Sequence, residues 1–512
     1  MDALETLKQD VQEGRIGPER LVELVVSSHR RFQDTLQQLQ DTQQQLKSAL
    51  QRIEELEKKQ GGSGTAKVDE SYSMKAEEKR QQKKNKTKPK PKGRRGRLNH
   101  KDKLAMVERT EHVYPLGVAP ENCKLSHTRL VWRVENGRTL MVAYEIYRGP
   151  KNRYGQIPGV LGRSGFGIEI VAAVAFLIYN TGVSFDKACE ILHFFQNLRL
   201  SKSQADALMK QLAKHWEREF GILCTLLANS AVVHADETSW SLNSVWAFLS
   251  ENARVLFFGV HKDAATLQMI LDAEVFKGIL ISDDAAVYAN FTNAQKCWAH
   301  LIRKAIKLTL QDRANAEYRT LTDGLLEIYR KACRVQRDPH LDDAGRAEAV
   351  KSLEDAVMTL CCGMWLAQMP PSKGIENDYR LLINEIMRLG LAEQLFTFVT
   401  AKPTVQPNGE TKPVAGTNNE AERTLRGPAG GRDTGRTNKT DNGTRRQTIL
   451  TSVLQSLRVY LPKFTLANVI EELKRWMSTG RSCFEEQLEK MKLVLPKIPV
   501  IDQTHPRPVP TG

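Results

Sequence analysis

Two aspartates in this 512-residue chain each follow a mostly apolar run. Asp236 follows residues 232–235, and Asp283 follows residues 278–282. Such runs are typical of strands buried on both faces, so the residue that ends the strand is the first to reach solvent. If the two strands are neighbours, their carboxylates meet at one edge of the sheet and repel each other unless a divalent cation lies between them. The pattern therefore predicts a magnesium site.

The charge of the chain indicates which substrate such a site serves. Lys and Arg number 75 against 60 Asp and Glu, which gives a formal net charge of +15. This excess favours a polyanionic partner, and with a magnesium site it indicates phosphodiester chemistry on nucleic acid. A membrane partner is disfavoured, because the longest apolar run, 170–179, is half a bilayer span and no signal peptide precedes it. Eight cysteines without a CxxC pair favour reduced thiols in a cytoplasmic protein.

A third acidic residue lies far along the chain, at the start of a predicted helix. Residues 418–426 read NNEAERTLR. Asn418 can cap this helix, and Glu422 and Arg426 share one face because they are four residues apart. A carboxylate followed by basic residues suits a metal site that faces a phosphate, although ordinary surface ion pairing produces the same pattern.

The segment 230–304 must position the two aspartates. Its patterning predicts three strands joined by tight turns, then a helix, a strand, a short helix, and a strand that leads into a basic helix. This is the element order of a ribonuclease H-like domain, in which the first and fourth strands are neighbours and Asp236 would lie beside Asp283. A doubly wound Rossmann sheet is the rival, but it needs helices between its first strands, where the sequence shows none.

The whole chain is expected to be a multidomain α/β (α+β) protein, because 512 residues exceed one compact core. The mixed-sheet catalytic core is predicted at 230–304 and 412–460, interrupted by an all-helical insertion at 305–411. Ahead of it we expect a coiled coil at 1–60, a flexible basic linker at 61–104, a small β-rich module at 105–150 and a helix-turn-helix-like region at 151–229. C-terminal helices and a Pro-rich tail occupy 461–512.

The N-terminal predictions rest on spacing and composition. Apolar residues recur every seven positions between residues 20 and 58, which favours a coiled coil over a lone surface helix. The run 79–97 holds eleven basic residues and no acid, so it cannot form a core. It either contacts phosphates or serves as a solubilising tether. The candidate phosphate contacts in it are Lys83, Lys84, Arg94 and Arg95.

Four motifs in this order closely resemble the DDE transposases of bacterial insertion sequences, specifically the insertion-sequence sixty-six family. The resemblance covers residues 160–460. The motifs are His234-Ala235-Asp236-Glu237-Thr238, Ser282-Asp283 with Tyr288, Cys297-Trp298-Ala299-His300-Leu301 with Arg303, and Asn418-Asn419 with Glu422, Arg423 and Arg426.

The resemblance implies a two-metal phosphoryl transfer. It places the catalytic and metal-binding triad on Asp236, Asp283 and Glu422, with Glu420 as the alternative to Glu422. Mg²⁺, or Mn²⁺ in its place, would support hydrolysis at a transposon end, and the freed 3′ hydroxyl would attack target DNA. The residues implied to shape the site are Tyr288, Cys297, His300, Arg303, Asn418 and Asn419.

The resemblance also implies partners and a location. These are double-stranded DNA, both terminal inverted repeats and target, a second copy of the chain, small accessory transposition proteins, and a bacterial, nucleoid-associated cytoplasmic setting. Beyond Glu422, basic residues separated by glycines suit phosphate clamping near the cut. They are Arg423, Arg426, Arg432, Arg436, Lys439, Arg445 and Arg446.

This chain departs from the family pattern in two places. The family usually carries a cysteine-rich zinc module ahead of the catalytic domain, but here that stretch keeps only Cys123, with His112 and His127 nearby. Structural zinc needs four N or S ligands, so we expect no zinc. The second departure is Asp284, where the family tends to have glycine. We expect its side chain to point to solvent.

Two other functions fit the sequence. A catalytically silent, transposase-derived DNA-binding regulator would keep the basic residues without using the acids. A metal-dependent nuclease would cut DNA without joining strands.

Overall fold

The computed structural model describes residues 33, 100–362, 374–438 and 440–495. The chain divides into two units, 1–97 and 98–512, and the second unit contains the elements described below. The predicted coiled coil lies outside the described residues except for Gln33, which is helical and exposed. The basic linker also lies outside them, apart from its last residues, which form the short helix α4 (His100–Leu104).

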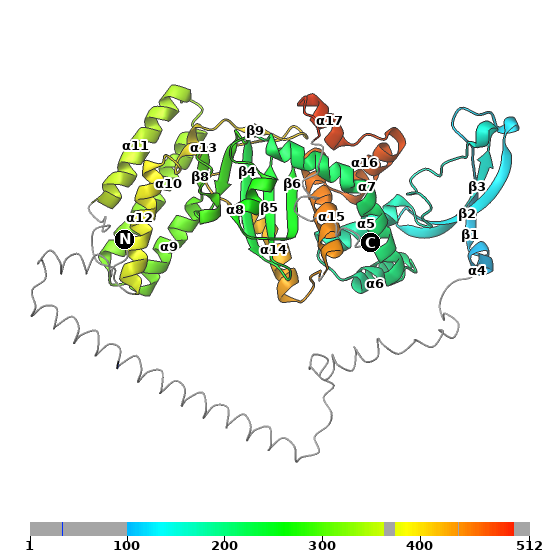
Figure 1. The fold of residues 1–512 in the computed structure, drawn as a ribbon, viewed down its shortest axis with the longest axis horizontal. Coiled ribbons are helices and arrows are strands. Elements are labelled where there is room, and N and C mark those ends of the chain that lie inside the picture. Colours follow the sequence, from blue (N-terminus) through cyan, green and yellow to red (C-terminus); the bar gives the residue numbers. More distant parts are fainter. Residues whose placement is uncertain (1–32, 34–99, 363–373, 439, 496–512) are drawn as a thin grey trace, which may run out of the picture. The chain divides into compact units, whose positions relative to one another are not determined.

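A five-stranded mixed sheet lies at the centre of the second unit, with the strand order β6-β5-β4-β7-β8 (Figure 1). The first three strands form an antiparallel meander, and β7 and β8 run parallel to β4. The sequence predicted each of these strands near its observed place, and β4 and β7 are neighbours as expected. The strands are β4 (Val232–Ser239), β5 (Ser244–Ser250), β6 (Arg254–Val260), β7 (Ile279–Ser282) and β8 (Ala294–Lys296).

The register between β4 and β7 decides where the two aspartates meet. His234 pairs with Ile281 at the end of the parallel ladder. Asp236 and Asp283 each lie two residues further along the chain, so they occupy equivalent positions at the same edge of the sheet. Both side chains are half-buried.

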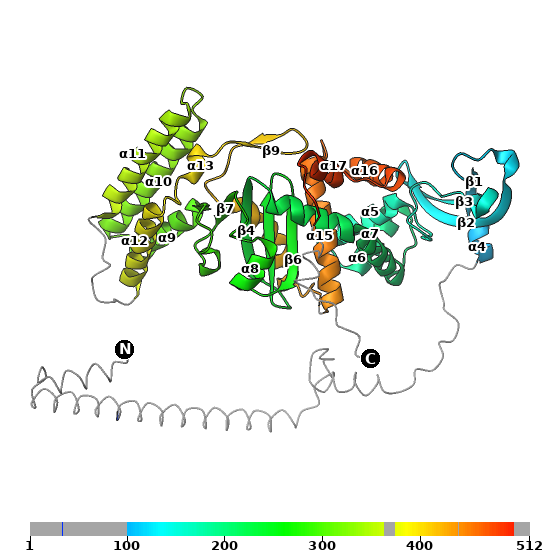
Figure 2. The ribbon, with the colours of Figure 1, turned by 45° about the horizontal axis from the view of Figure 1, so that its top comes forward.

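The edge strand β6 is covered by helix α15 (Asp441–Tyr460) (Figure 2). Hydroxyl groups at every fourth position of the helix accept hydrogen bonds from backbone N–H groups of the strand, at 2.9–3.0 Å. An uncovered edge strand would leave these donors unsatisfied and open to pairing with another chain. The pairs are Thr448 with Phe258, Ser452 with Leu256, and Ser456 with Arg254.

Helices from the predicted DNA-binding region pack against the same end of the sheet. Ser201 caps α7 through a capping box with Gln204, and Asn197 closes α6 in the left-handed conformation. The long helix α7 buries much of its length in the largest core cluster. The elements of this region are α5 (Ile168–Ala175), the π-helical turn η3 (Phe176–Asn180), α6 (Phe185–Gln196) and α7 (Lys202–Ala228). The C-terminal helices α16 (Leu466–Thr479) and α17 (Cys483–Lys490) pack against α5 and α7.

Helices of the insertion form a separate core on the β8 side of the sheet. Within the range predicted to be all-helical, the structure also has a short antiparallel pair, β9 (Thr404–Val405) with β10 (Thr411–Lys412). Two-residue strands carry no periodicity that a sequence reading detects. The helices are α9 (Trp298–Gln311), α10 (Ala316–Arg337), α11 (Asp343–Cys362), α12 (Ile375–Leu391) and α13 (Thr397–Thr400).

The β-rich module predicted at 105–150 is a three-stranded sheet in the order β1-β3-β2 with a small core of its own. A buried ion pair joins it to the helical region, with Arg133 Nε 2.8 Å from Glu169 Oε1. Its strands are β1 (Val107–Val113), β2 (Lys124–Glu135) and β3 (Arg138–Arg148). Among the described residues, no helix is long and apolar enough to cross a membrane.

The contact between α15 and β6 predicts how the fold responds to two neighbouring substitutions. Ser452→Ala leaves the N–H of Leu256 without its acceptor, which should lower the free energy of unfolding by about 1–3 kcal/mol. The control is Thr451→Val, because the buried Thr451 hydroxyl has no hydrogen-bond partner among the described residues and should be replaceable without loss. The midpoints of urea unfolding measure the stability of both variants. If the two substitutions lower stability equally, the hydrogen bond from Leu256 to Ser452 does not stabilise the contact.

Candidate active site

Asp236 and Asp283 lie at the shared edge of β4 and β7, each held by one nearby backbone amide. Asp236 Oδ1 accepts a hydrogen bond from the N–H of Glu237, and Asp283 Oδ1 accepts one from Ala285, both at 3.0 Å. The pKa of Asp236 is raised to about 7, mainly by burial and also by the charges of Glu237, Asp283 and Glu422, while the backbone hydrogen bond from Glu237 acts in the opposite direction. Asp283 and Glu422 are therefore near enough to Asp236 for their charges to act on it. Among the described residues, the three acids do not bring their ligand atoms within 4.8 Å of one another.

Glu422 is brought to this edge by helix α14 (Asn419–Asp433), and Asn418 attaches the start of that helix to the sheet. The fully buried Asn418 donates from its side-chain amide to the carbonyl of Ala235, at 2.7 Å. Its Oδ1 lies 3.3 Å from Nδ1 of His234. The expectation that Asn418 caps the helix was wrong, since its side chain makes no capping hydrogen bond. It binds the residue that precedes Asp236 instead.

The two candidate glutamates of α14 have different partners. Glu420 forms an ion pair with Arg254 of β6. Burial alone would raise the pKa of Glu420, but the charges of Arg254 and His234 lower it overall. Glu422 instead faces α9, where Arg303 Nη2 donates to its Oε1 at 2.6 Å. The geometry thus favours Glu422 over Glu420 as the third acid beside Asp236.

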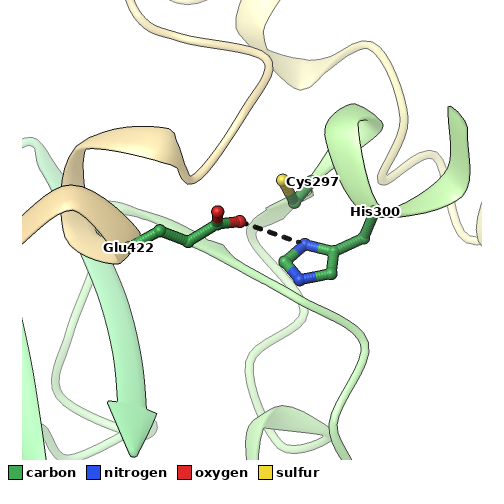
Figure 3. A group of neighbouring side chains, drawn as sticks. All are labelled: Cys297, His300 and Glu422. Carbon is green, nitrogen blue, oxygen red and sulfur yellow. Dashed lines mark ion pairs between the residues drawn. The ribbon is translucent and has the colours of Figure 1, made fainter. Parts of the chain in front are cut away.

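Cys297 and His300, at the start of α9, lie next to Glu422 (Figure 3). His300 Nδ1 is 3.6 Å from Glu422 Oε1. One ligand atom from each of these three residues lies within 4.8 Å of the other two. The backbone N–H of Asn418 donates to Cys297 Sγ at 3.1 Å, so the same residue connects β4, α9 and α14. Asn419, the first residue of α14, follows directly.

Glu237 and Lys296 also contribute to the site, although neither was assigned a role from the sequence. The carboxylate of Glu237 is 2% exposed and lies 2.6 Å from Lys262 Nζ, and Tyr288 donates its hydroxyl hydrogen to it. The buried Lys296 donates from Nζ to the carbonyl of Asp283 at 3.1 Å. The signals were available, because Glu237 adjoins Asp236 within the quoted motif and Lys296 lies where the last predicted strand leads into the basic helix.

The expectation that Asp284 points to solvent was wrong. Its side chain is 22% exposed and forms an ion pair with Arg388 of α12. A residue beside Asp283 is thereby tied to the helical insertion. The insertion thus contacts the same edge of the sheet as the acids.

The basic residues beyond Glu422 fall into two groups. Arg423 and Arg426 are exposed, and neither has an ion-pair partner among the described residues. Four others are engaged within the protein: Arg432 by Thr238 and Ser239, Arg436 by the carbonyl of Gly182, Arg445 by Glu217, and Arg446 by Asp206. The side chains of Arg445 and Arg446 are only 12% and 14% exposed. Lys439, Lys83, Lys84, Arg94 and Arg95 lie outside the described residues.

The sequence pattern of the Transposase IS66 family matches residues 163–446, more than half of the chain. The chain belongs to this family. Membership supports a transposase that binds and processes DNA. The matched range includes the five-stranded sheet, the insertion and α14, and it excludes the β1–β3 module and helices α16 and α17. No curated protein matches the chain.

The raised pKa of Asp236 predicts a dependence of stability on pH in this transposase. Folding raises this pKa from its ordinary 3.8 to about 7, so the folded protein holds the proton more tightly. Without divalent metal, stability should therefore fall as the pH rises from roughly 4 to 7, by at most about 4 kcal/mol. Asp236→Asn removes the charge and should raise Tm at pH 8 in EDTA by a few degrees.

Thermal unfolding at pH 5 and pH 8, with EDTA or Mg²⁺, measures this effect. Mg²⁺ should raise the Tm of the parent protein and leave that of Asp236→Asn unchanged, since a ligand stabilises only the state that binds it. Asp323→Asn is the control, because Asp323 is an exposed acid on α10 paired with Arg319. If Asp236→Asn has the same Tm as the parent protein under all four conditions, the buried Asp236 carboxylate does not cause the loss of stability at high pH.

Proposed function

We propose that this protein is a DDE transposase that cuts DNA at transposon ends and joins the freed 3′ hydroxyl to target DNA. Its core would be a ribonuclease H-like domain, a proposal supported by the order of the five strands and by the parallel pairing of β4 with β7. The single observation that carries the proposal is the register of β4 and β7, which places Asp236 and Asp283 at equivalent positions of one sheet edge. Glu422 lies near enough for its charge to raise the pKa of Asp236. Family membership supplies the reaction class.

The proposed site offers ligands that suit magnesium. Carboxylate oxygens are the donors that Mg²⁺ takes, and one or two carboxylates per ion are sufficient. A bound divalent cation, Mg²⁺ or Mn²⁺, would supply an activated water and would stabilise charge on the phosphate. Asp236, Asp283 and Glu422 would hold it, and a cation there would favour the ionised form of Asp236, whose pKa is raised by burial and by the charges of Glu237, Asp283 and Glu422.

Protein groups around the three acids would keep them in place during the reaction. Asn418 holds Glu422 to β4 through the carbonyl of Ala235. Lys296 holds the backbone of Asp283. Glu237, which is paired with Lys262 and with the Tyr288 hydroxyl, adds to the charge beside Asp236 without being able to reach solvent. No covalent bond between protein and DNA is required for this chemistry.

DNA would contact the exposed basic residues of α14. Arg423 and Arg426 carry no ion-pair partner among the described residues, and both follow Glu422 within four positions. Guanidinium groups form bidentate contacts with phosphates, so these two are the best candidates for holding the strand next to the cut. The buried ion pairs of Arg445 and Arg446 favour a role for those two in fixing α15 to α7. Binding to terminal inverted repeats, self-association and accessory proteins remain part of the proposal.

The proposal predicts which acids are essential. Asp236→Asn, Asp283→Asn and Glu422→Gln should each lower Mg²⁺-dependent cleavage by at least about 100-fold, while leaving DNA binding intact. The matched control is Glu420→Gln, on the same helix, whose partner is Arg254 and which should retain cleavage. The measurement is nicking of duplexes taken from the DNA that flanks the reading frame.

Outcomes distinguish the proposed transposase from its two alternatives. Parent protein that binds these duplexes but cuts none of them, in Mg²⁺ or Mn²⁺, would indicate a silent regulator. Cleavage without joined product from pre-cut ends would indicate a nuclease. Loss of cleavage in Glu420→Gln, with activity retained in Glu422→Gln, would exchange the roles of the two glutamates.

A further inference from the structure

Three side chains with different donor atoms meet beside the proposed magnesium site. Cys297 precedes helix α9, His300 lies three residues later on its first turn, and Glu422 reaches them from α14 (Figure 3). Their Sγ, imidazole nitrogen and carboxylate oxygen all lie within 4.8 Å of one another. In the described part of the chain, this is the one group of three such residues whose ligand atoms lie that close, whereas Asp236, Asp283 and Glu422 would have to move closer together to hold a shared ion.

The donor set differs from that of the three acids. Magnesium takes oxygen ligands, whereas a thiolate with an imidazole and a carboxylate is a set that zinc prefers. Three protein ligands leave the fourth tetrahedral position for water. The two sites would therefore select different ions although they share Glu422.

Nδ1 of His300 supports a ligand role. This atom is buried and has no hydrogen-bond partner among the described residues. Its 3.6 Å distance to Glu422 Oε1 is too long for a hydrogen bond. Buried polar atoms are nearly always satisfied, so an unpaired imidazole nitrogen that faces a thiol and a carboxylate calls for a partner that the protein does not supply.

The surroundings of Cys297 also suit a metal-bound thiolate. Its side chain is almost fully buried, and its Sγ accepts a hydrogen bond from the backbone N–H of Asn418 at 3.1 Å. Burial raises the pKa of the thiol, while the backbone N–H groups of Asn418, His300 and Ala299 act in the opposite direction. A position at the start of a helix favours negative charge as well. A bound cation would displace the thiol proton to solvent.

The sequence led us to expect no zinc, but on the grouping of these three side chains we propose that Cys297, His300 and Glu422 bind a zinc ion, and that zinc there competes with the catalytic metal for Glu422. The competition rests on the proposed function, whereas the binding of zinc does not. Arg303, which now donates to Glu422 Oε1, would have to move aside or leave the metal the other carboxylate oxygen. Its side chain is 53% exposed, so solvent can take over its hydrogen bonds.

The binding is tested with Co²⁺, a spectroscopic substitute for Zn²⁺, added to full-length protein from which metals have been stripped under reducing conditions. One equivalent should produce a thiolate-to-cobalt charge-transfer band and the visible bands of a tetrahedral ion, and Zn²⁺ should remove both. Cys297→Ser should abolish the charge-transfer band. His300→Ala and Glu422→Gln should keep that band but weaken affinity at least about tenfold.

The matched control is Cys123→Ser, which removes a thiol from the β1–β3 module and should bind Co²⁺ as the parent does. Absence of the bands in the parent, or their persistence in Cys297→Ser, overturns the proposal. Thermal unfolding without metal checks that each variant folds. If Cys297→Ser does not fold, unchanged Co²⁺ affinity in both His300→Ala and Glu422→Gln overturns the proposal instead.

The competition has a separate readout. At a fixed Mg²⁺ concentration, Zn²⁺ should inhibit DNA cleavage by the parent protein. Cys297→Ser should need a Zn²⁺ concentration at least about ten times higher for the same fractional inhibition, with each rate expressed relative to that of the same protein without zinc. Equal sensitivity overturns the competition. A protein that binds Co²⁺ through Cys297 but cuts no DNA refutes the proposed function and leaves the zinc site standing.

Discussion

The parallel pairing of β4 with β7 is the constraint on which the rest of the site depends. It aligns Asp236 with Asp283 at the edge of a buried sheet, where neither carboxylate is fully hydrated. Burial and neighbouring charge raise the pKa of Asp236 to about 7, so the fold holds an acid in an environment that disfavours its ionised form. A divalent cation would stabilise the ionised form of Asp236. The strand pairing that buries the two aspartates therefore also creates the need for a bound cation.

The third acid depends on a single buried amide. Asn418 contacts the carbonyl of Ala235, the imidazole of His234 and the thiol of Cys297, so three segments distant in sequence share one residue. The helical insertion is also connected to the edge, because Arg388 of α12 pairs with Asp284. Movements of the insertion would therefore be transmitted to the residue next to Asp283.

Several features of the site were predictable because they follow from local pattern. Apolar runs ended by an aspartate indicated two buried strands, and the order of elements indicated that these strands are neighbours, as β4 and β7 are. Other features were not predictable. Asn418 was expected to cap α14 and binds β4 instead, and Asp284 was expected in solvent and pairs with Arg388. In both cases the partner comes from an element more than 100 residues away.

The sequence by itself determined the family, the strand that carries Asp236, the strand that Asp283 follows and the helix that carries Glu422, because periodicity and motif order are properties of the chain alone. Only the tertiary structure decided which partners the two glutamates of α14 take. It did so because Arg254 of β6 engages Glu420 while α9 presents Arg303, His300 and Cys297 to Glu422. Two glutamates two residues apart on a helix point in different directions, and only the packed neighbours determine which direction leads to the site.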